Sequence, residues 1–122
     1  MPARFTTVDD ATIGALLRAF YGRARLDPVL GPVFEGAVED WEGHFETLTR
    51  FWSSAMLGSG RYKGDALAVH RAQPIRPEHF DLWLGYWSQT ARALFAPELA
   101  ALFEAKAAGI GESLKLGLFF RP

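Results

Sequence analysis

The stretch DWEGHFETLTRFWSSAML, residues 40–57, decides the fold, because its apolar side chains recur at helical spacing. The stripe consists of Trp41, Phe45, Leu48, Phe51, Trp52, Ala55 and Met56. His44 lies on the same face, one turn from Trp41 and from Leu48. Gly58-Ser59-Gly60 follows and ends the pattern. We therefore predict a long amphipathic helix with a histidine on its apolar face.

The segment before this helix is predicted to hold one helix and one turn. Thr7 and Asp10 have the spacing of a capping box, so the first helix should begin near Thr7. Its apolar stripe is Ile13, Leu16, Leu17, Phe20 and Tyr21. Asp27-Pro28 stops the helix, and LGPVF at residues 30–34 reads as a constrained turn.

The segment after the long helix is predicted to hold three more helices. A short one spans residues 66–72, with Asp65 as N-cap and Pro74 closing it. A long one begins near Pro77, and the last covers residues 98–117. Their buried faces are Phe80, Trp83, Leu84, Trp87 and Leu94, then Leu99, Leu102, Phe103, Ile110 and Leu114. No strand alternation is convincing, so the predicted fold is one all-α domain over residues 1–122.

Composition excludes several classes of function. Thirteen Lys and Arg balance fourteen Asp and Glu, which gives no electrostatic case for nucleic acid or an anionic membrane. The absence of cysteine excludes disulfides, thiolate chemistry and covalent haem attachment. The chain has no secretory apolar start and no apolar stretch of about 20 residues, so we expect a cytoplasmic protein.

The three histidines occupy different settings. His70 lies on the short helix, which would be a weak unit unless something such as a metal–imidazole bond docked it. Taken alone, His70 and His44 are more often hydrogen-bonded core or boundary groups. His79, between Glu78 and Asp81, is predicted to lie on the surface.

The aromatic residues also have two interpretations. Trp52 and Trp83 more often fill a core, and Tyr21 more often points its hydroxyl to water. Together with the histidines, however, they suit a planar ligand between two helices, with one histidine on each side.

In this combination of residues the chain resembles the truncated haemoglobins, and among them group III. The matching segments are Phe20-Tyr21, Gly31-Pro32-Val33-Phe34, Trp41-x-x-His44, Phe51-Trp52, Gly60-x-Tyr62-x-Gly64, His70 and Trp83-Leu84. They extend over residues 8–115, nearly the whole chain, and the paired-glycine signatures of groups I and II are missing.

The resemblance implies a two-over-two helical sandwich around b-type haem, with His70 as the proximal iron ligand. Tyr21, His44 and Trp83 match the polar distal residues that stabilise a bound ligand. The predicted haem contacts are Phe20, Phe34, Leu48, Phe51, Trp52, Leu67, His70, Phe80 and Trp83. Arg50, Tyr62 and Arg71 are guesses for contacts to the haem propionates.

The function implied is binding of dioxygen, carbon monoxide, nitric oxide or peroxide. Several distal donors should slow the release of dioxygen, which suits redox chemistry or sensing better than delivery. A haem-dependent nitric oxide dioxygenase or peroxidase-like activity, with an unidentified reductase, is one alternative. A non-enzymatic gas sensor or ligand store is another, and a haem-free helical interaction domain is the third.

Overall fold

The computed structural model describes residues 3–119, which form six helices and no strand. The helices are α1 (Asp10–Ala24), α2 (Leu30–Ala37), α3 (Trp41–Leu57), α4 (Ala66–Arg71), α5 (Pro77–Leu94) and α6 (Pro97–Phe119). The predicted all-α class is confirmed. Over the same residues, none of the helices combines the length and the apolarity needed to cross a membrane.

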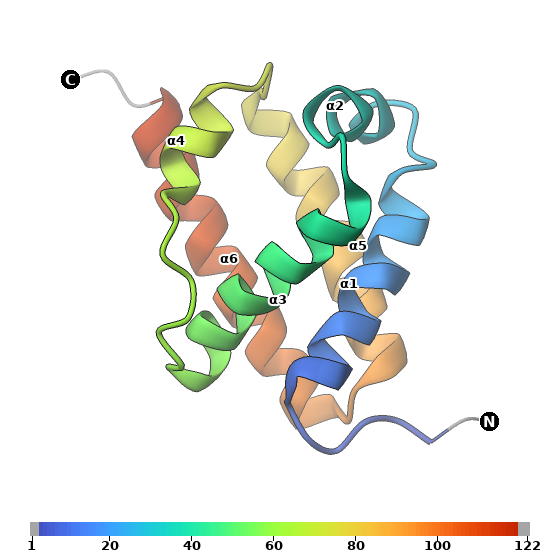
Figure 1. Ribbon diagram of the computed structural model, residues 1–122. Coiled ribbons are helices and arrows are strands. Elements are labelled where there is room, and N and C mark those ends of the chain that lie inside the picture. Colours follow the sequence, from blue (N-terminus) through green and yellow to red (C-terminus); the bar gives the residue numbers. More distant parts are fainter. Residues whose placement is uncertain (1–2, 120–122) are drawn as a thin grey trace.

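The four long helices form two layers. α1 packs against α3, and this pair lies in front of the pair α5 and α6 in Figure 1. The two layers meet through α1 on α5 and α3 on α6. The core between them holds large side chains, with Trp87, Phe20, Phe95 and Phe103 almost fully buried. This arrangement is the predicted two-over-two sandwich.

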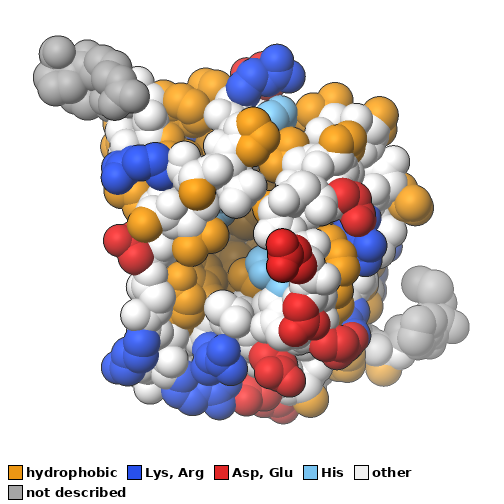
Figure 2. All heavy atoms as spheres, turned by 45° about the horizontal axis from the view of Figure 1, so that its top comes forward, with side chains coloured by type: hydrophobic (Ala, Val, Ile, Leu, Met, Phe, Trp, Pro, Cys, Tyr) orange, Lys and Arg blue, Asp and Glu red, His pale blue; other side chains and the backbone are white. Residues whose placement is uncertain are grey.

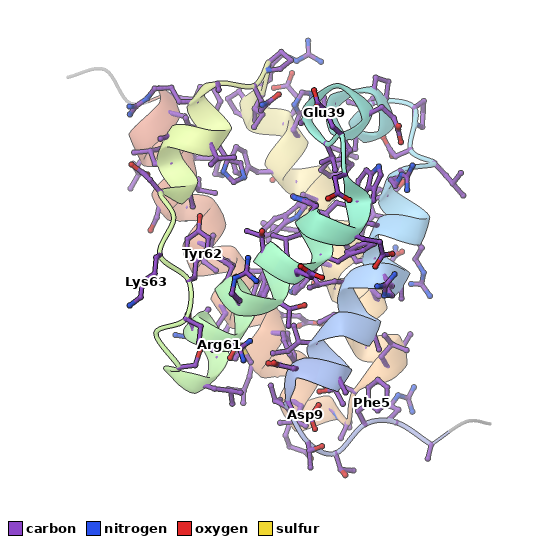
Figure 3. All side chains as sticks on the ribbon, viewed as in Figure 1. Phe5, Asp9, Glu39, Arg61, Tyr62 and Lys63 are labelled. Carbon is purple, nitrogen blue, oxygen red and sulfur yellow. The ribbon has the colours of Figure 1, made fainter. Side chains whose placement is uncertain are left out.

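The N-cap of the first helix lies two residues later than predicted. Asp9, not Thr7, is the N-cap: its carboxylate accepts from the Thr12 amide at 2.8 Å, and Thr12 Oγ1 accepts from the Asp9 amide at 3.0 Å. The sequence offers the same spacing twice, and the second pair makes the capping box. Upstream, Phe5 pairs with Phe95 in a single parallel bridge, beside the junction of α5 and α6 (Figure 3).

The expected turn at residues 30–34 is instead the start of α2. Pro32 lies in the first helical turn, where its missing amide costs no hydrogen bond. Asp27 Oδ1 accepts from the amides of Val29 and Leu30 at 2.8 and 2.9 Å and so initiates the helix. Gly31 is required by packing, because a Cβ there would lie 2.5 Å from the Arg25 carbonyl oxygen.

The later helices follow the predicted pattern closely. Asp40 caps α3 through the Gly43 amide at 3.1 Å, and Gly58 ends the helix in the left-handed conformation with φ of 66°. Asp65 caps α4 through the Ala68 amide at 3.1 Å. Leu102, predicted to face inward, is 54% exposed, so this prediction is wrong. It lies beyond the edge of the α6 stripe that contains Phe103.

Candidate functional site

A cavity of about 300 Å³ opens between α3, α4 and α5. Figure 2 shows it as a hollow with hydrophobic walls and a histidine at its rim. Its lining is mainly aliphatic and aromatic, and the polar side chains in it are few. A cavity of this size and polarity is typical of a site for a small organic ligand or cofactor.

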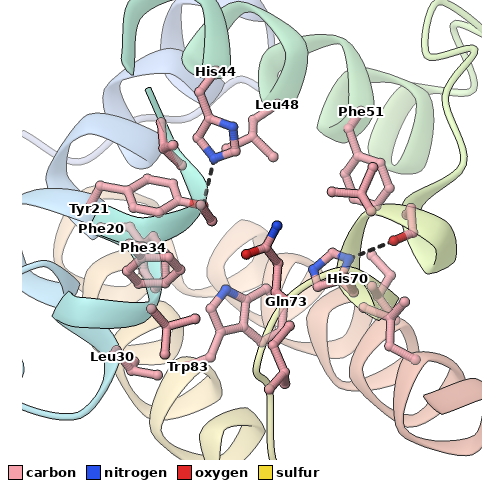
Figure 4. A pocket seen from close by; sticks show the side chains of 18 of the residues that line it. Phe20, Tyr21, Leu30, Phe34, His44, Leu48, Phe51, His70, Gln73 and Trp83 are labelled. Atoms are coloured by element: carbon pink, nitrogen blue, oxygen red, sulfur yellow. Dashed lines mark hydrogen bonds between the residues drawn. The ribbon is translucent and has the colours of Figure 1, made fainter. Parts of the chain in front are cut away.

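His70 enters the cavity from α4 (Figure 4). Its Nδ1 lies 2.6 Å from the Ala66 carbonyl oxygen, one turn earlier in the same helix. A carbonyl can only accept, so Nδ1 carries the proton and donates it. Nε2 is then left with its lone pair available, as a metal ligand requires.

Tyr21 and His44 lie across the cavity from His70 (Figure 4). The Tyr21 hydroxyl is 3.3 Å from His44 Nε2, a hydrogen bond that joins α1 to α3 at the cavity. Tyr21 is only 7% exposed, against the expectation of a boundary residue with its hydroxyl in water.

Burial sets the protonation of this pair. Burial raises the pKa of Tyr21, so the hydroxyl keeps its proton at neutral pH. Burial lowers the pKa of His44 below its ordinary value. Both groups are therefore neutral near pH 7, and a Tyr21 hydroxyl that accepts from His44 Nε2–H keeps its own hydrogen free to donate into the cavity.

Three tryptophans form one wall of the cavity. Trp87 stacks on Trp52 at 4.4 Å between ring centroids, and Trp83 stacks on Trp87 at 6.0 Å. Trp87 Nε1 donates to the Phe103 carbonyl at 3.2 Å and is thereby satisfied within the core. The Trp83 indole faces the cavity, where its N–H is available to a ligand (Figure 4).

The structure brings most of the predicted contact residues together. Phe20, Phe34, Leu48, Phe51, Trp52, Phe80 and Trp83 all line the cavity with His70. Phe34 comes from α2 and packs edge-on against Tyr21, with 5.1 Å between centroids. Leu67 does not line the cavity: its methyl groups lie against Gly117 of α6.

The three residues guessed to contact the haem propionates lie in different positions relative to the cavity. Tyr62, on the loop between α3 and α4, lines the cavity and packs edge-on on Phe51 (Figure 3). Arg50 donates to Thr47 Oγ1 at 3.3 Å, and Thr47 lines the cavity. Arg71 is exposed and lies outside the lining.

Sequence reasoning missed three polar residues of the site, Thr47, Gln73 and His79. Gln73 follows α4 and points its amide into the cavity between His70 and the Tyr21–His44 pair (Figure 4). His79 is 7% exposed and lines the cavity, so its assignment to the surface is wrong. Its Nδ1 accepts from the Arg76 amide at 3.1 Å and so satisfies that N–H at the start of α5. The available signal was Pro77, which marks the first helical position and puts His79 at the third, from which a side chain can reach back to the N-cap amide.

A two-over-two helical sandwich, with an imidazole facing a buried polar pair across an apolar cavity, defines a globin. No protein-family model matches the chain. The chain is 32% identical over 101 residues to the group 3 truncated haemoglobin ctb of Campylobacter jejuni, a match that covers 79% of this chain and 80% of that protein. The crystal structure of the group III truncated haemoglobin from Campylobacter jejuni matches with a TM-score of 0.90 and 28% identity, over 96% of both chains. The chain belongs to the group III truncated haemoglobins, as its sequence motifs predicted.

Proposed function

We propose that this globin binds b-type haem in the cavity, with His70 as the proximal ligand, and that it binds dioxygen and related diatomic molecules. The observation that carries the proposal is the state of His70. Its Nδ1–H is held by the Ala66 carbonyl at 2.6 Å, and Nε2 is left as the one lone pair that α4 directs into an apolar cavity.

The residues present fit haem. The donor set is an imidazole on one side and the hydrogen-bonded pair of Tyr21 and His44 on the other, which suits an iron porphyrin. The walls between them are apolar, which suits the porphyrin faces. When bound, haem supplies the iron that holds a diatomic ligand and carries the redox chemistry.

The chain supplies orientation and hydrogen bonds. The Ala66 carbonyl fixes the tautomer and the plane of the His70 ring. Tyr21 Oη and Trp83 Nε1 are donors at the far side of the cavity, and His44 is close enough to Tyr21 to orient its hydroxyl. Phe34, Leu48 and Phe51 exclude water, which strengthens these hydrogen bonds.

The two donors on the distal side, Tyr21 Oη and Trp83 Nε1, favour slow release of a polar ligand. Slow release suits oxidation of nitric oxide, reduction of peroxide, or sensing better than oxygen delivery. A turnover assay with a reductant and nitric oxide separates the first role from the second, since only an enzyme consumes the gas repeatedly. The buried polar groups of the cavity support these roles over a haem-free interaction domain.

The test is His70→Gly. The purified wild-type protein should show a Soret band. The variant should lose most haem, and added imidazole should restore the spectrum by occupying the place of the side chain. His44→Gly is the matched control and should keep its haem. An unchanged ferrous spectrum in His70→Gly would overturn the assignment.

A further inference from the structure

The helix that carries His70 has almost no anchor of its own. α4 has six residues, a length that is not stable as an isolated helix. None of its residues is buried. Within residues 3–119, no hydrogen bond or ion pair joins α4 to another helix, because its side-chain hydrogen bonds are the Asp65 cap and the bond from His70 to Ala66.

One side chain of α4 makes a different contact. Ala66, Val69 and His70 line the cavity, whereas Leu67 is half-buried and does not. Leu67 packs on α6, where a Cβ on Gly117 would lie 2.8 and 3.1 Å from its two methyl carbons. Figure 1 shows α4 beside the C-terminal end of α6, its main packing partner. Gly117 therefore leaves room for Leu67 that any larger residue would fill.

We propose that Leu67 and Gly117 form a positioning contact that sets how far His70 reaches into the cavity. Leu67 precedes His70 by three residues, so the two lie one turn apart on the helix. A shift of Leu67 away from α6 moves α4 as a unit and carries the His70 ring with it. The inference rests on the proposed role of His70 as haem ligand and adds the residues that place it.

The experiment compares valine at two glycines of α6. Gly117→Val overlaps Leu67, whereas Gly109→Val places its Cβ where no atom lies within 4 Å. Both variants change the same helix and carry the same β-branched side chain, so their difference reports the contact. We expect Gly117→Val to release haem about tenfold faster than the wild type, equivalent to about 1.4 kcal/mol. Gly109→Val should release it at the wild-type rate.

Two spectroscopic readouts separate positioning from general stability. The iron–histidine stretching band of the ferrous protein should shift in Gly117→Val and in Leu67→Ala, and should not shift in Gly109→Val. In the apoprotein, Leu67→Ala should speed hydrogen exchange at the amides of residues 69–71 more than at those of α5. The double variant Leu67→Ala/Gly117→Val exchanges volume across the contact and should recover most of the wild-type haem retention.

The outcomes distinguish the two levels of the proposal. Wild-type haem release and an unshifted band in both Gly117→Val and Leu67→Ala would overturn the positioning contact and leave His70 as the ligand. Unchanged haem binding in His70→Gly would overturn the proposed function, and exchange at the α4 amides of the apoprotein would still test the Leu67–Gly117 contact.

Discussion

Replacing Tyr21 with phenylalanine tests the distal side of the cavity most directly. The substitution removes one hydroxyl and keeps the ring, which packs edge-on against Phe20, Phe34 and Trp41 at 4.8 to 5.1 Å. The fold should therefore survive. The 3.3 Å bond to His44 is longer than usual, so its loss should lower the free energy of unfolding by only about 1 kcal/mol.

The effect on ligand release should be larger. Bound dioxygen carries partial negative charge, and a hydrogen bond to a charged group contributes about 1.5–3 kcal/mol. Since each 1.4 kcal/mol is about tenfold, Tyr21→Phe should speed dioxygen dissociation by roughly 10- to 100-fold. Trp83→Phe should act in the same direction. Carbon monoxide, which is less polar when bound, should respond less in both.

The assay is stopped-flow dissociation of dioxygen and carbon monoxide from both single variants and the double variant. The two effects should be non-additive, because the donors share one acceptor. Tyr86→Phe is the matched control: its hydroxyl donates to Asp27 at 2.6 Å, and the residue does not line the cavity. Unchanged dioxygen release in all three cavity variants would refute the polar distal side and return Tyr21 and Trp83 to packing.

Three further predictions concern His44 and Gly31. His44→Leu should change the association rates of dioxygen and carbon monoxide while haem stays bound, because His44 lines the cavity opposite His70. Flash photolysis measures these rates. Identical rates in the variant and the wild type would mean that His44 is only a core group. The pKa of His44 is lower in the folded apoprotein than in the unfolded chain, so the unfolded chain binds a proton at His44 more readily. His44 therefore contributes stability above pH 6.5 that is lost as pH falls through the folded pKa. Denaturant midpoints measured from pH 7.5 to 5 should drop less in His44→Leu than in the wild type. Equal slopes in the two proteins would contradict that sign. Gly31→Ala should destabilise the protein by about 1–3 kcal/mol in a urea titration, because its Cβ meets the Arg25 backbone, whereas Gly36→Ala in the same helix meets nothing within 4 Å and should not destabilise it.

The helices themselves were readable from the sequence, because a helix and its caps depend on residues within a few positions of one another. The stripe from Trp41 to Met56 and the Gly58 stop placed α3, and Asp65 placed the start of α4. The errors arose where local signals competed. Thr7 and Asp9 were both possible N-caps for α1. The sequence Gly31-Pro32 is typical of a turn, but Gly31 packs closely on the Arg25 backbone and the Asp27 carboxylate bonds the first amides of α2, which favours a helix.

The roles of the site residues were predicted from motifs that match a known family in their order along the chain. Periodicity placed Tyr21 and His44 on apolar helix faces. Only the resemblance of the chain to a family assigned both residues to the same ligand-binding side of the site. His79 looked like a surface group because its neighbours Glu78 and Asp81 are charged, and Gln73 gave no signal at all.

The sequence by itself thus determined the described helices other than α2, most of their apolar faces and the family, since these depend on local spacing and on matched motifs. Only the tertiary structure decided which side chains meet, because contacts between distant segments depend on how the layers pack. Packing brought Gln73 and His79 to the cavity and placed Tyr21 Oη 3.3 Å from His44. It also turned Leu67 away from the cavity and onto Gly117. Leu67 and Gly117 lie on helices that are close in space and far apart in sequence. The spacing of residues within one helix cannot predict such a contact.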